Sequence, residues 1–312
     1  MPGAISPRAA IAAANLHVDA VAVEAIEAMR AVGLDPILFK GPDTANWLGE
    51  ESVRAYQDCD LLVDPADEDR AGAVLERLGY NPYMEGADLG ERWTHPARLW
   101  RRGADQVDLH HSLFGAESDP AEVWVQLSDR TTALRRGRTE LTVLDRTATA
   151  LVLALHAAQH GRAVAQPLDH LRLALARIER TSWEEAAGVA VSIGATAAFA
   201  AGLRLVPEGE ALAHELALPD APPVTVALAA ASAPPQALAL EQLTSQPGLR
   251  AKAAYVGRRL VPSAPWMRVS YPIARRGPVG LAAAHVWRLA SAPVRIGRAV
   301  PAWRRARRRA AA

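Results

Sequence analysis

Two aspartates separated by one residue, Asp58 and Asp60, come directly before the apolar residues 61–63. On an extended backbone, residues two apart project to the same side, so both carboxylates can hold one cation. Oxygen ligands suit Mg²⁺, which takes one or two carboxylates together with phosphate oxygens and water. Further along the chain, Asp108 can complete a site for two ions, one activating the attacking group and the other neutralising the leaving phosphate. The three aspartates therefore predict metal-assisted phosphoryl chemistry.

Positively charged residues that could receive a triphosphate lie close to the aspartate pair in the sequence. Lys40 and Arg54 would supply charge to phosphate oxygens, and Gly41 would let the backbone approach because it has no Cβ. Lysine is rare in this arginine-rich chain, with Lys252 the only other one. Each residue alone has an ordinary alternative: aspartates beside strands often cap turns, and an arginine here can be a simple surface ion pair.

Hydrophobic periodicity indicates the elements that must position these residues. Apolar residues at helical spacing predict a helix over residues 15–30, ended by Gly33. A second helix is expected from a cap at Asp64 to about Leu78. Strands are expected at residues 36–39, 59–63, 91–100 and 105–113. In the last strand Asp108 and His110 share one face, so we expect the lysine and the three carboxylates to meet at one edge of a sheet.

The character of the sequence changes near residue 145, where Ala- and Leu-rich segments with helical spacing replace the strand signals. These segments predict helices at residues 147–160, 168–180 and 183–206. We expect an α+β protein with a small mixed sheet flanked by helices. Its expected divisions are a core over residues 1–145, an all-helical region over 146–250 and a basic Pro/Arg-rich C-terminal extension over 251–312.

Composition narrows the class of protein. The 312 residues carry a net charge of +1 and one cysteine, Cys59, which excludes an intramolecular disulfide or a Cys-rich metal site and favours a reducing cytoplasm. The N-terminal residues lack the pattern of an export signal. No long apolar window is free of charge or proline, so no spanning helix is expected. The last acidic residue is Glu241, and the basic extension after it could contact nucleic acid or an anionic membrane, or be a solvated or poorly ordered extension.

Four pieces of the sequence occur in an order that resembles a known family. They are Leu38-Phe39-Lys40-Gly41, Arg54 with Asp58-Cys59-Asp60-Leu61-Leu62-Val63, Leu78-Gly79-Tyr80, and Val107-Asp108-Leu109-His110. This pattern resembles a nucleotidyltransferase family of the DNA-polymerase-β-like superfamily, over about residues 15–160. The resemblance implies a small mixed sheet with a helical domain behind it. It also implies that Asp58 and Asp60 bind metal and that Asp108 is the third carboxylate.

Some residues depart from the family pattern or have open roles. Phe39 and Pro42 flank the Lys-Gly pair where the family more often has an aliphatic and a small residue, and the Gly-Ser signature of many nucleotidyltransferases is missing. His110 is a possible auxiliary residue of the site. His156 and His160, four apart on a predicted helix, face the same way. They could bind a metal or a phosphate, or pack between helices.

The resemblance and the residues together predict an enzyme that moves a nucleoside monophosphate from an NTP such as ATP to a small-molecule or peptide acceptor, releasing pyrophosphate. Asp58, Asp60 and Asp108 would hold two Mg²⁺ ions, while Lys40, Gly41 and Arg54 would bind the nucleotide. The alternative is a catalytically silent protein that binds a nucleotide or a partner as an accessory of a biosynthetic pathway. A third interpretation, a polymerase-like enzyme acting on nucleic acid, depends on the basic extension alone.

Overall fold

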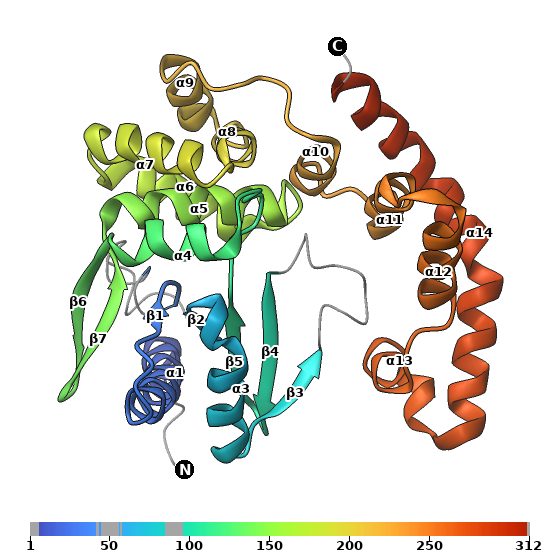
Figure 1. The fold of residues 1–312 in the computed structure, drawn as a ribbon, viewed down its shortest axis with the longest axis horizontal. Helices are drawn as coiled ribbons and strands as arrows, with labels where there is room; N and C mark the ends of the chain where they lie inside the picture. Colours follow the sequence, from blue (N-terminus) through green and yellow to red (C-terminus); the bar gives the residue numbers. More distant parts are fainter. Residues whose placement is uncertain (1–5, 42–43, 45–55, 57, 85–95, 311–312) are drawn as a thin grey trace.

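The computed structural model describes residues 6–41, 44, 56, 58–84 and 96–310. Figure 1 shows a sheet with two helices against one face, a layer of helices across one end of the strands, and a further group of helices from the C-terminal part of the chain. The predicted nucleotide-binding residue Arg54 and the divergent Pro42 lie outside the described residues. The α+β class predicted from the sequence is confirmed.

The sheet is mixed and has seven strands in the order β3-β4-β5-β2-β1-β7-β6. The strands are β1 (Ile37–Leu38), β2 (Cys59–Leu62), β3 (Asn81–Met84), β4 (Ala97–Arg102), β5 (Asp105–His110), β6 (Thr131–Arg136) and β7 (Thr139–Leu144). The pairs β2–β5 and β1–β7 are parallel and the other pairs are antiparallel. The parallel pair β2–β5 brings together segments that are about fifty residues apart in the chain.

The helix α1 (Pro7–Arg30) begins earlier than predicted, because Ser6 caps it by accepting a hydrogen bond from the Ala9 amide at 3.2 Å. By length and composition α1 is apolar enough to cross a membrane, a criterion that core helices also meet. Its buried side chains, including Val21, Ile26 and Met29, pack against one face of the sheet. This packing accounts for the apolar face of α1 within the fold.

The helix α3 (Glu68–Arg77) lies beside α1 on the same face of the sheet (Figure 1). Asp64 accepts a hydrogen bond from the Ala66 amide at 2.9 Å, as the predicted cap requires, and a 3₁₀ turn precedes the helix. The edge strand β3, next to α3 in sequence, was not predicted. It contains Pro82, which has no amide hydrogen to donate and is tolerated at a sheet edge.

A layer of helices packs on one end of the sheet, against Ile37, Leu62 and Leu144 on the face opposite α1. Its members are α4 (Pro120–Ser128), α5 (Arg146–His160), α6 (Ala165–Arg177), α7 (Arg180–Ser192), α8 (Thr196–Leu203) and α9 (Pro207–Glu215). The expected single helix over 183–206 is wrong: Gly194, with a φ of +68°, ends α7 before α8 begins. The central helix α5 is buried on nearly all sides, which explains its Ala/Leu-rich sequence. At Gly202 a Cβ would come within 1.9 Å of the Ala154 carbonyl oxygen, so glycine is required where α8 crosses α5.

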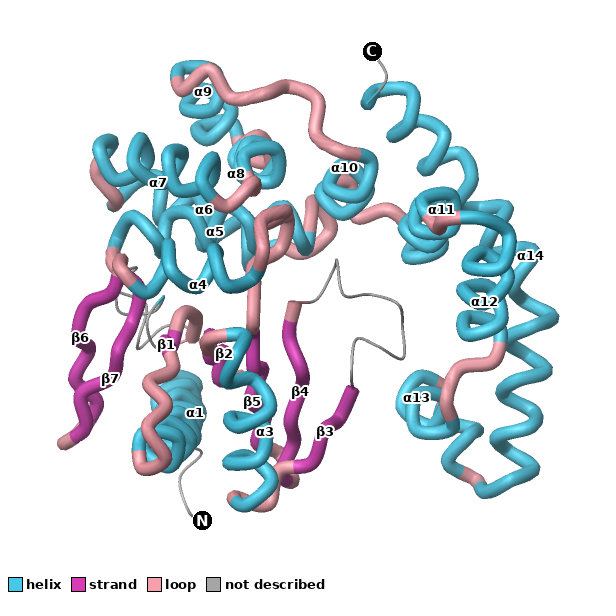
Figure 2. The backbone as a smooth tube through the Cα atoms, in the orientation of Figure 1, coloured by secondary structure: helices cyan, strands magenta, loops and turns pink. Residues whose placement is uncertain are grey.

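The remaining helices follow in sequence: the first of them, α10 (Val224–Ala230), packs on α5 and α8 of the helical layer, and the others lie at one side of the molecule, as Figure 2 shows. The others are α11 (Pro235–Ser245), α12 (Gly248–Leu260), α13 (Ala264–Ser270) and α14 (Gly277–Ala310). The described residues of the C-terminal extension are mainly helical, which does not fit a poorly ordered extension, and many of them are exposed to solvent. A small apolar cluster that includes Leu228, Ala237 and Ala299 joins α10, α11 and α14.

Candidate active site

Two buried aspartates meet in the centre of the sheet. In the parallel pair β2–β5, Asp60 lies directly opposite Asp108, and Leu62 lies opposite His110. Leu61 belongs to the core under α1, whereas Leu62 belongs to the core under the helical layer. Because strand residues alternate between faces, Asp60 shares the face of Leu62 and is directed toward the helical layer. The register of β2 with β5 therefore brings Asp60, Asp108 and His110 together on this face.

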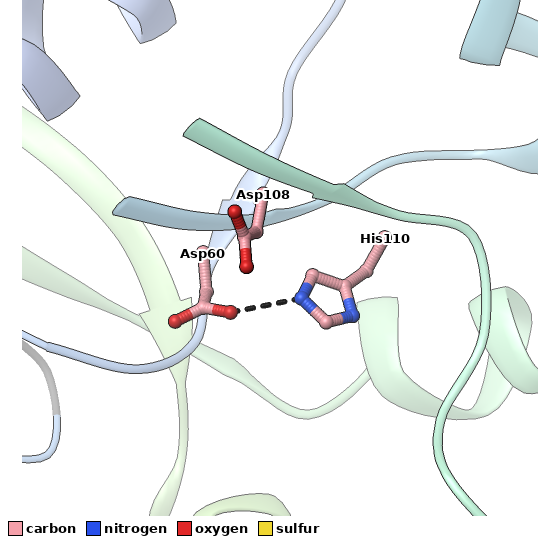
Figure 3. A group of neighbouring side chains, drawn as sticks. All are labelled: Asp60, Asp108 and His110. Carbon is pink, nitrogen blue, oxygen red and sulfur yellow. Dashed lines mark hydrogen bonds and ion pairs between the residues drawn. The ribbon is translucent and has the colours of Figure 1, made fainter. Parts of the chain in front are cut away.

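These three side chains are close enough to share one ligand. Asp60 is 2% exposed, and Asp108 and His110 are each 6% exposed. One ligand atom from each lies within 4.8 Å of those of the other two. Figure 3 shows the two carboxylates and the imidazole converging from neighbouring strands. The predicted convergence of Asp60 and Asp108, distant in sequence, is thus present in the fold.

Hydrogen bonds hold both carboxylates in place. Oδ1 of Asp60 accepts from Lys40 Nζ at 2.6 Å and from His110 Nε2 at 2.8 Å. Since an ionised carboxylate only accepts, His110 donates from Nε2. Oδ1 of Asp108 accepts from the Gln106 side-chain amide at 2.9 Å. Gln106 was not singled out from the sequence, although its position two residues before Asp108 places it on the same strand face.

The turn after β1 places Lys40 beside Asp60. The Phe39 amide donates to the Asp60 carbonyl oxygen at 3.3 Å, which continues the strand pairing up to the lysine. Gly41 follows with a φ of +69°, and a Cβ there would lie 3.3 Å from the Asp58 carbonyl oxygen. This left-handed backbone explains the glycine. The Phe39 ring packs edge-on against His110 with centroids 4.7 Å apart, so the aromatic residue that departs from the family pattern supports the site.

The segment before Asp58 is anchored to α1. The Tyr56 amide donates to Asn15 Oδ1 at 3.1 Å, and its hydroxyl donates to Asp19 Oδ1 at 2.6 Å. Asn15 is 4% exposed, and this contact explains a buried amide on an otherwise apolar helix face. Asp58 itself is half-buried immediately before β2.

Burial and neighbouring charges shift the pKa values of the carboxyl groups in the site. Burial, and then the charge of Asp60, raise the pKa of Asp58 to about 6. Burial and the charges of Asp60 and Asp58 raise the pKa of Asp108 to about 7. For Asp60, burial is outweighed by Lys40 and His110, which hold its pKa below the usual range. Burial also opposes the charge on Lys40, but Asp60, Asp58 and Asp108 together raise the pKa of Lys40.

The donor set fits a divalent cation. The group that could share an ion consists of Asp60, Asp108 and His110, and Asp58 lies outside it. Burial, and then the charges of the neighbouring aspartates, raise the pKa values of Asp58 and Asp108, and Lys40 is the cation beside these carboxylates. A divalent ion bound there would offset the charges of the carboxylates. The carboxylates would hold a hard ion such as Mg²⁺. The imidazole of His110 could either coordinate the ion through a ring nitrogen or orient Asp60 by hydrogen bonding.

A family comparison identifies the class of protein. The model of a family described as "Uncharacterised nucleotidyltransferase" matches residues 6–208, more than half of the chain. The chain belongs to this nucleotidyltransferase family. The match agrees with the resemblance seen in the sequence, and it extends from α1 through the sheet and most of the helical layer. The helices from α10 onward lie beyond it. No curated protein matches the chain.

Solved structures show weaker similarity. The solution structure of the antibiotic-resistance factor ANT(2'')-Ia is 15% identical with a TM-score of 0.43, over 61% of this chain and 96% of that one. A crystal structure of ANT(2'')-Ia with adenylyl-2''-tobramycin is 18% identical with a TM-score of 0.41, over 58% and 95%. An antigenic nucleotidyltransferase-like protein from Paracoccidioides brasiliensis is 16% identical with a TM-score of 0.35, over 52% and 75%. Similarity at this level assigns no substrate.

In this nucleotidyltransferase-family chain a pocket opens next to Lys40 and His110, between the sheet and α5. Its empty volume is about 300 Å³, part of it open to solvent, and its walls include Phe114, His156 and Gln159. Phe114 and Gln159 were not singled out from the sequence. Their positions in this pocket depend on how α5 crosses the sheet, which no local pattern specifies.

The two histidines of α5 are in contact with each other, with ring centroids 4.4 Å apart in an edge-to-face arrangement. Burial, followed by the charge of Lys40, lowers the pKa of His156 well below its usual range. His156 is therefore a neutral imidazole that lines the pocket. The two roles considered for this pair, binding a metal or a phosphate and packing between helices, both stay predictions, and His156 lines the pocket beside Lys40.

Proposed function

We propose that this protein is a metal-dependent nucleotidyltransferase that moves a nucleoside monophosphate from an NTP to a small-molecule or peptide acceptor and releases pyrophosphate. The observation that carries the proposal is the pairing of Asp60 with Asp108 across β2 and β5, beside His110 and Lys40. Membership of the nucleotidyltransferase family supplies the reaction class. The excess of buried carboxylates over lysine supports the need for divalent cations.

In this proposal Asp58, Asp60 and Asp108 are the metal ligands. Two Mg²⁺ ions bound by them would polarise the phosphate oxygens and neutralise the departing pyrophosphate. Lys40 keeps its positive charge in the site because the carboxylates raise its pKa. Lys40, Gly41 and Arg54 would receive the triphosphate. His110 holds Asp60 in its orientation through the 2.8 Å hydrogen bond.

The transfer is a displacement at the α-phosphorus of the NTP. The acceptor oxygen or nitrogen forms a bond to that phosphorus while the bond from it to the bridging oxygen of the β-phosphate breaks. Pyrophosphate leaves with the bond's electron pair, and the acceptor's proton passes to Asp108. The acceptor would approach beside Lys40 and His110, where a small pocket with both apolar and polar walls is lined by Phe114, His156 and Gln159.

A two-step experiment tests the proposal. Calorimetry would measure binding of each of the four common NTPs with and without Mg²⁺, and pyrophosphate release would then be followed over a panel of hydroxyl and amine acceptors. Asp108→Asn keeps the shape of the side chain and removes an ionisable ligand. Asp129→Asn is the matched control, since Asp129 is exposed at the end of α4, outside the site.

We expect Mg²⁺-dependent NTP binding and pyrophosphate release that Asp108→Asn reduces roughly 10³-fold, because a metal-held charge contributes several kcal/mol to the transition state. Asp129→Asn should behave as the wild type. Equal turnover by the two variants would refute the site assignment. NTP binding with no pyrophosphate release from any acceptor would instead favour the catalytically silent accessory protein.

A further inference from the structure

The C-terminal helix α14 carries an exposed apolar stripe. Residues three, four or seven apart along it are exposed and uncharged, and they lie on one side of the helix. They are Val279, Ala283, Val286, Trp287, Ala290, Pro293, Val294, Gly297 and Pro301. The four largest aliphatic and aromatic members, Val279, Val286, Trp287 and Val294, are 81%, 67%, 65% and 58% exposed. At 1.5 Å per residue the stripe is about 33 Å long.

The opposite side of α14 is the side that packs on the protein. Gly280, Ala284, Ala299 and Ala306 are its buried residues: Ala299 and Ala306 lie roughly half a turn away from the stripe, Ala284 lies about a third of a turn away, and Gly280 lies at its border. Figures 1 and 2 show α14 along the outer edge of the molecule, with α11, α12 and α13 on its inner side. The stripe is therefore directed away from the rest of the described chain.

Exposed apolar side chains are concentrated in this part of the molecule. Eleven of the sixteen exposed large hydrophobic residues in the described chain lie between Leu249 and Ile296. Single exposed apolar residues are ordinary on soluble proteins, whereas a continuous set marks an interaction surface. The stripe on α14 belongs to the second kind because its members follow one another along a single helix face.

The charges around the stripe have one sign. Residues 242–312 contain no aspartate or glutamate and fifteen lysines and arginines. The last carboxylate before them, Glu241, already accepts from Trp303 at 2.7 Å and lies 3.7 Å from Arg307. Exposed arginines follow the stripe toward the C-terminus, at positions 298, 304, 305, 308 and 309. The surface therefore offers an apolar strip bordered by cations.

These properties favour one kind of binding partner for the stripe on α14. A second copy docked through the same face would bring its exposed α14 arginines near those of the first, which opposes self-association. Nucleic acid would satisfy the arginines, but its phosphate backbone offers nothing to a strip of valines and tryptophan. An anionic bilayer offers both an apolar interior for the strip and phosphate headgroups for the arginines. The inner side of α14 carries Arg288 and Arg295 and packs on α11, so α14 is suited to lie in the interface rather than to span it.

We propose that the outer face of α14 docks on an anionic membrane surface. Val286, Trp287 and Val294 enter the region between headgroups and acyl chains, and the arginines contact lipid phosphates. This role is independent of the nucleotide chemistry, because the site on β2 and β5 and the stripe on α14 involve different residues. It gives the protein a location beside the membrane.

Vesicle flotation with the full chain tests this docking. The probes are vesicles of phosphatidylcholine alone and of phosphatidylcholine mixed with phosphatidylglycerol. The variant is Val286→Glu, and the matched control is Val191→Glu on α7, because Val191 is 66% exposed and Val286 is 67% exposed. Both variants add the same charge at equally exposed positions, and thermal unfolding of each checks that the fold is intact.

We expect binding to the mixed vesicles at least about tenfold stronger than to phosphatidylcholine, and weaker at high salt. Val286→Glu should reduce that binding by roughly tenfold or more, while Val191→Glu leaves it unchanged. Failure of the wild type to bind mixed vesicles would overturn the proposal, as would equal binding by the two variants. Sedimentation that shows a dimer dissociated by Val286→Glu would assign the stripe to self-association instead, and tight DNA binding without vesicle binding would assign the surface to nucleic acid.

Discussion

The sheet with its helical layer and the C-terminal group of helices are built on different principles. Residues 6–208 match the nucleotidyltransferase family and supply most of the two large apolar cores on the sheet. The C-terminal helices have small clusters made mostly of alanine, such as Ala237, Ala299 and Ala306, and they expose many large apolar side chains. The first region buries acids at fixed positions, and the second presents cations and apolar residues outward. One is organised around an internal site, the other around a surface.

The largest expected effects are on activity, at Asp60 and Asp108, and the stability of the two variants should differ. Asp60→Asn and Asp108→Asn should both reduce pyrophosphate release roughly 10³-fold. Only Asp60→Asn should also lower the stability of the metal-free protein, by up to about 3 kcal/mol, because Lys40 then lacks its partner. Denaturant unfolding of both variants measures this difference. Equal losses of stability would show that Asp60 does not have the special pairing with Lys40 and His110 that the geometry gives it.

Substituting one leucine in each region compares how tightly the helical layer and the C-terminal helices are packed. Leu151 is fully buried in α5, and Leu289 on α14 is 44% exposed. Leu151→Ala should destabilise the protein by about 3–5 kcal/mol through the cavity it leaves. Leu289→Ala should change the free energy of unfolding by about 0.5 kcal/mol or less. Chemical denaturation provides both values, and a large loss at Leu289 would mean that the C-terminal helices are packed more like the core than their exposure indicates.

A smaller effect is expected at Gln106, which holds Asp108 without being charged. Gln106→Ala removes the 2.9 Å hydrogen bond to Asp108. Loss of such a supporting contact should weaken divalent-cation affinity by about 10-fold, within the range for residues that orient metal ligands. Calorimetric titration with Mn²⁺ measures this, and Gln236→Ala, in the C-terminal group, is the control. An unchanged Mn²⁺ affinity would remove Gln106 from the site.

The smallest predicted effect is a pH dependence of metal-linked stability. Asp58 and Asp108 have folded pKa values of about 6 and about 7, above their ordinary value of 3.8. A raised carboxyl pKa contributes stability below pH 3.8 that is lost as the pH rises through 6 and 7. Mg²⁺ offsets that loss, so it should raise the melting temperature by a few degrees more at pH 8 than at pH 5. In Asp108→Asn this difference should shrink, and an increment independent of pH would contradict the crowding of carboxylates.

Strand periodicity predicted much of the site. It predicted less of the fold. Alternation within the strand placed Asp108 and His110 on one face, and the turn residues placed Lys40 at a strand end. The parallel pairing of β2 with β5 could not be predicted, because it joins segments whose register depends on the whole sheet. For the same reason, the hydrogen bond from His110 to Asp60 was not foreseen.

The long helix α14 was not predicted because its sequence contains prolines. Proline normally ends a helix because it lacks an amide hydrogen and clashes with the preceding turn. Pro293 and Pro301 nevertheless lie inside α14, where both are exposed on the apolar stripe. Gly194 had the opposite effect, because a positive φ divided a continuous helical pattern into α7 and α8.

A structure of the protein with Mg²⁺ and a non-hydrolysable NTP analogue tests the central claim most directly. We predict divalent cations bound by Asp60 and Asp108 together with Asp58, and the triphosphate beside Lys40 and Gly41. A nucleotide bound elsewhere, or cations that leave Asp60 and Asp108 without contact, would contradict the account of this sheet as a nucleotidyltransferase site.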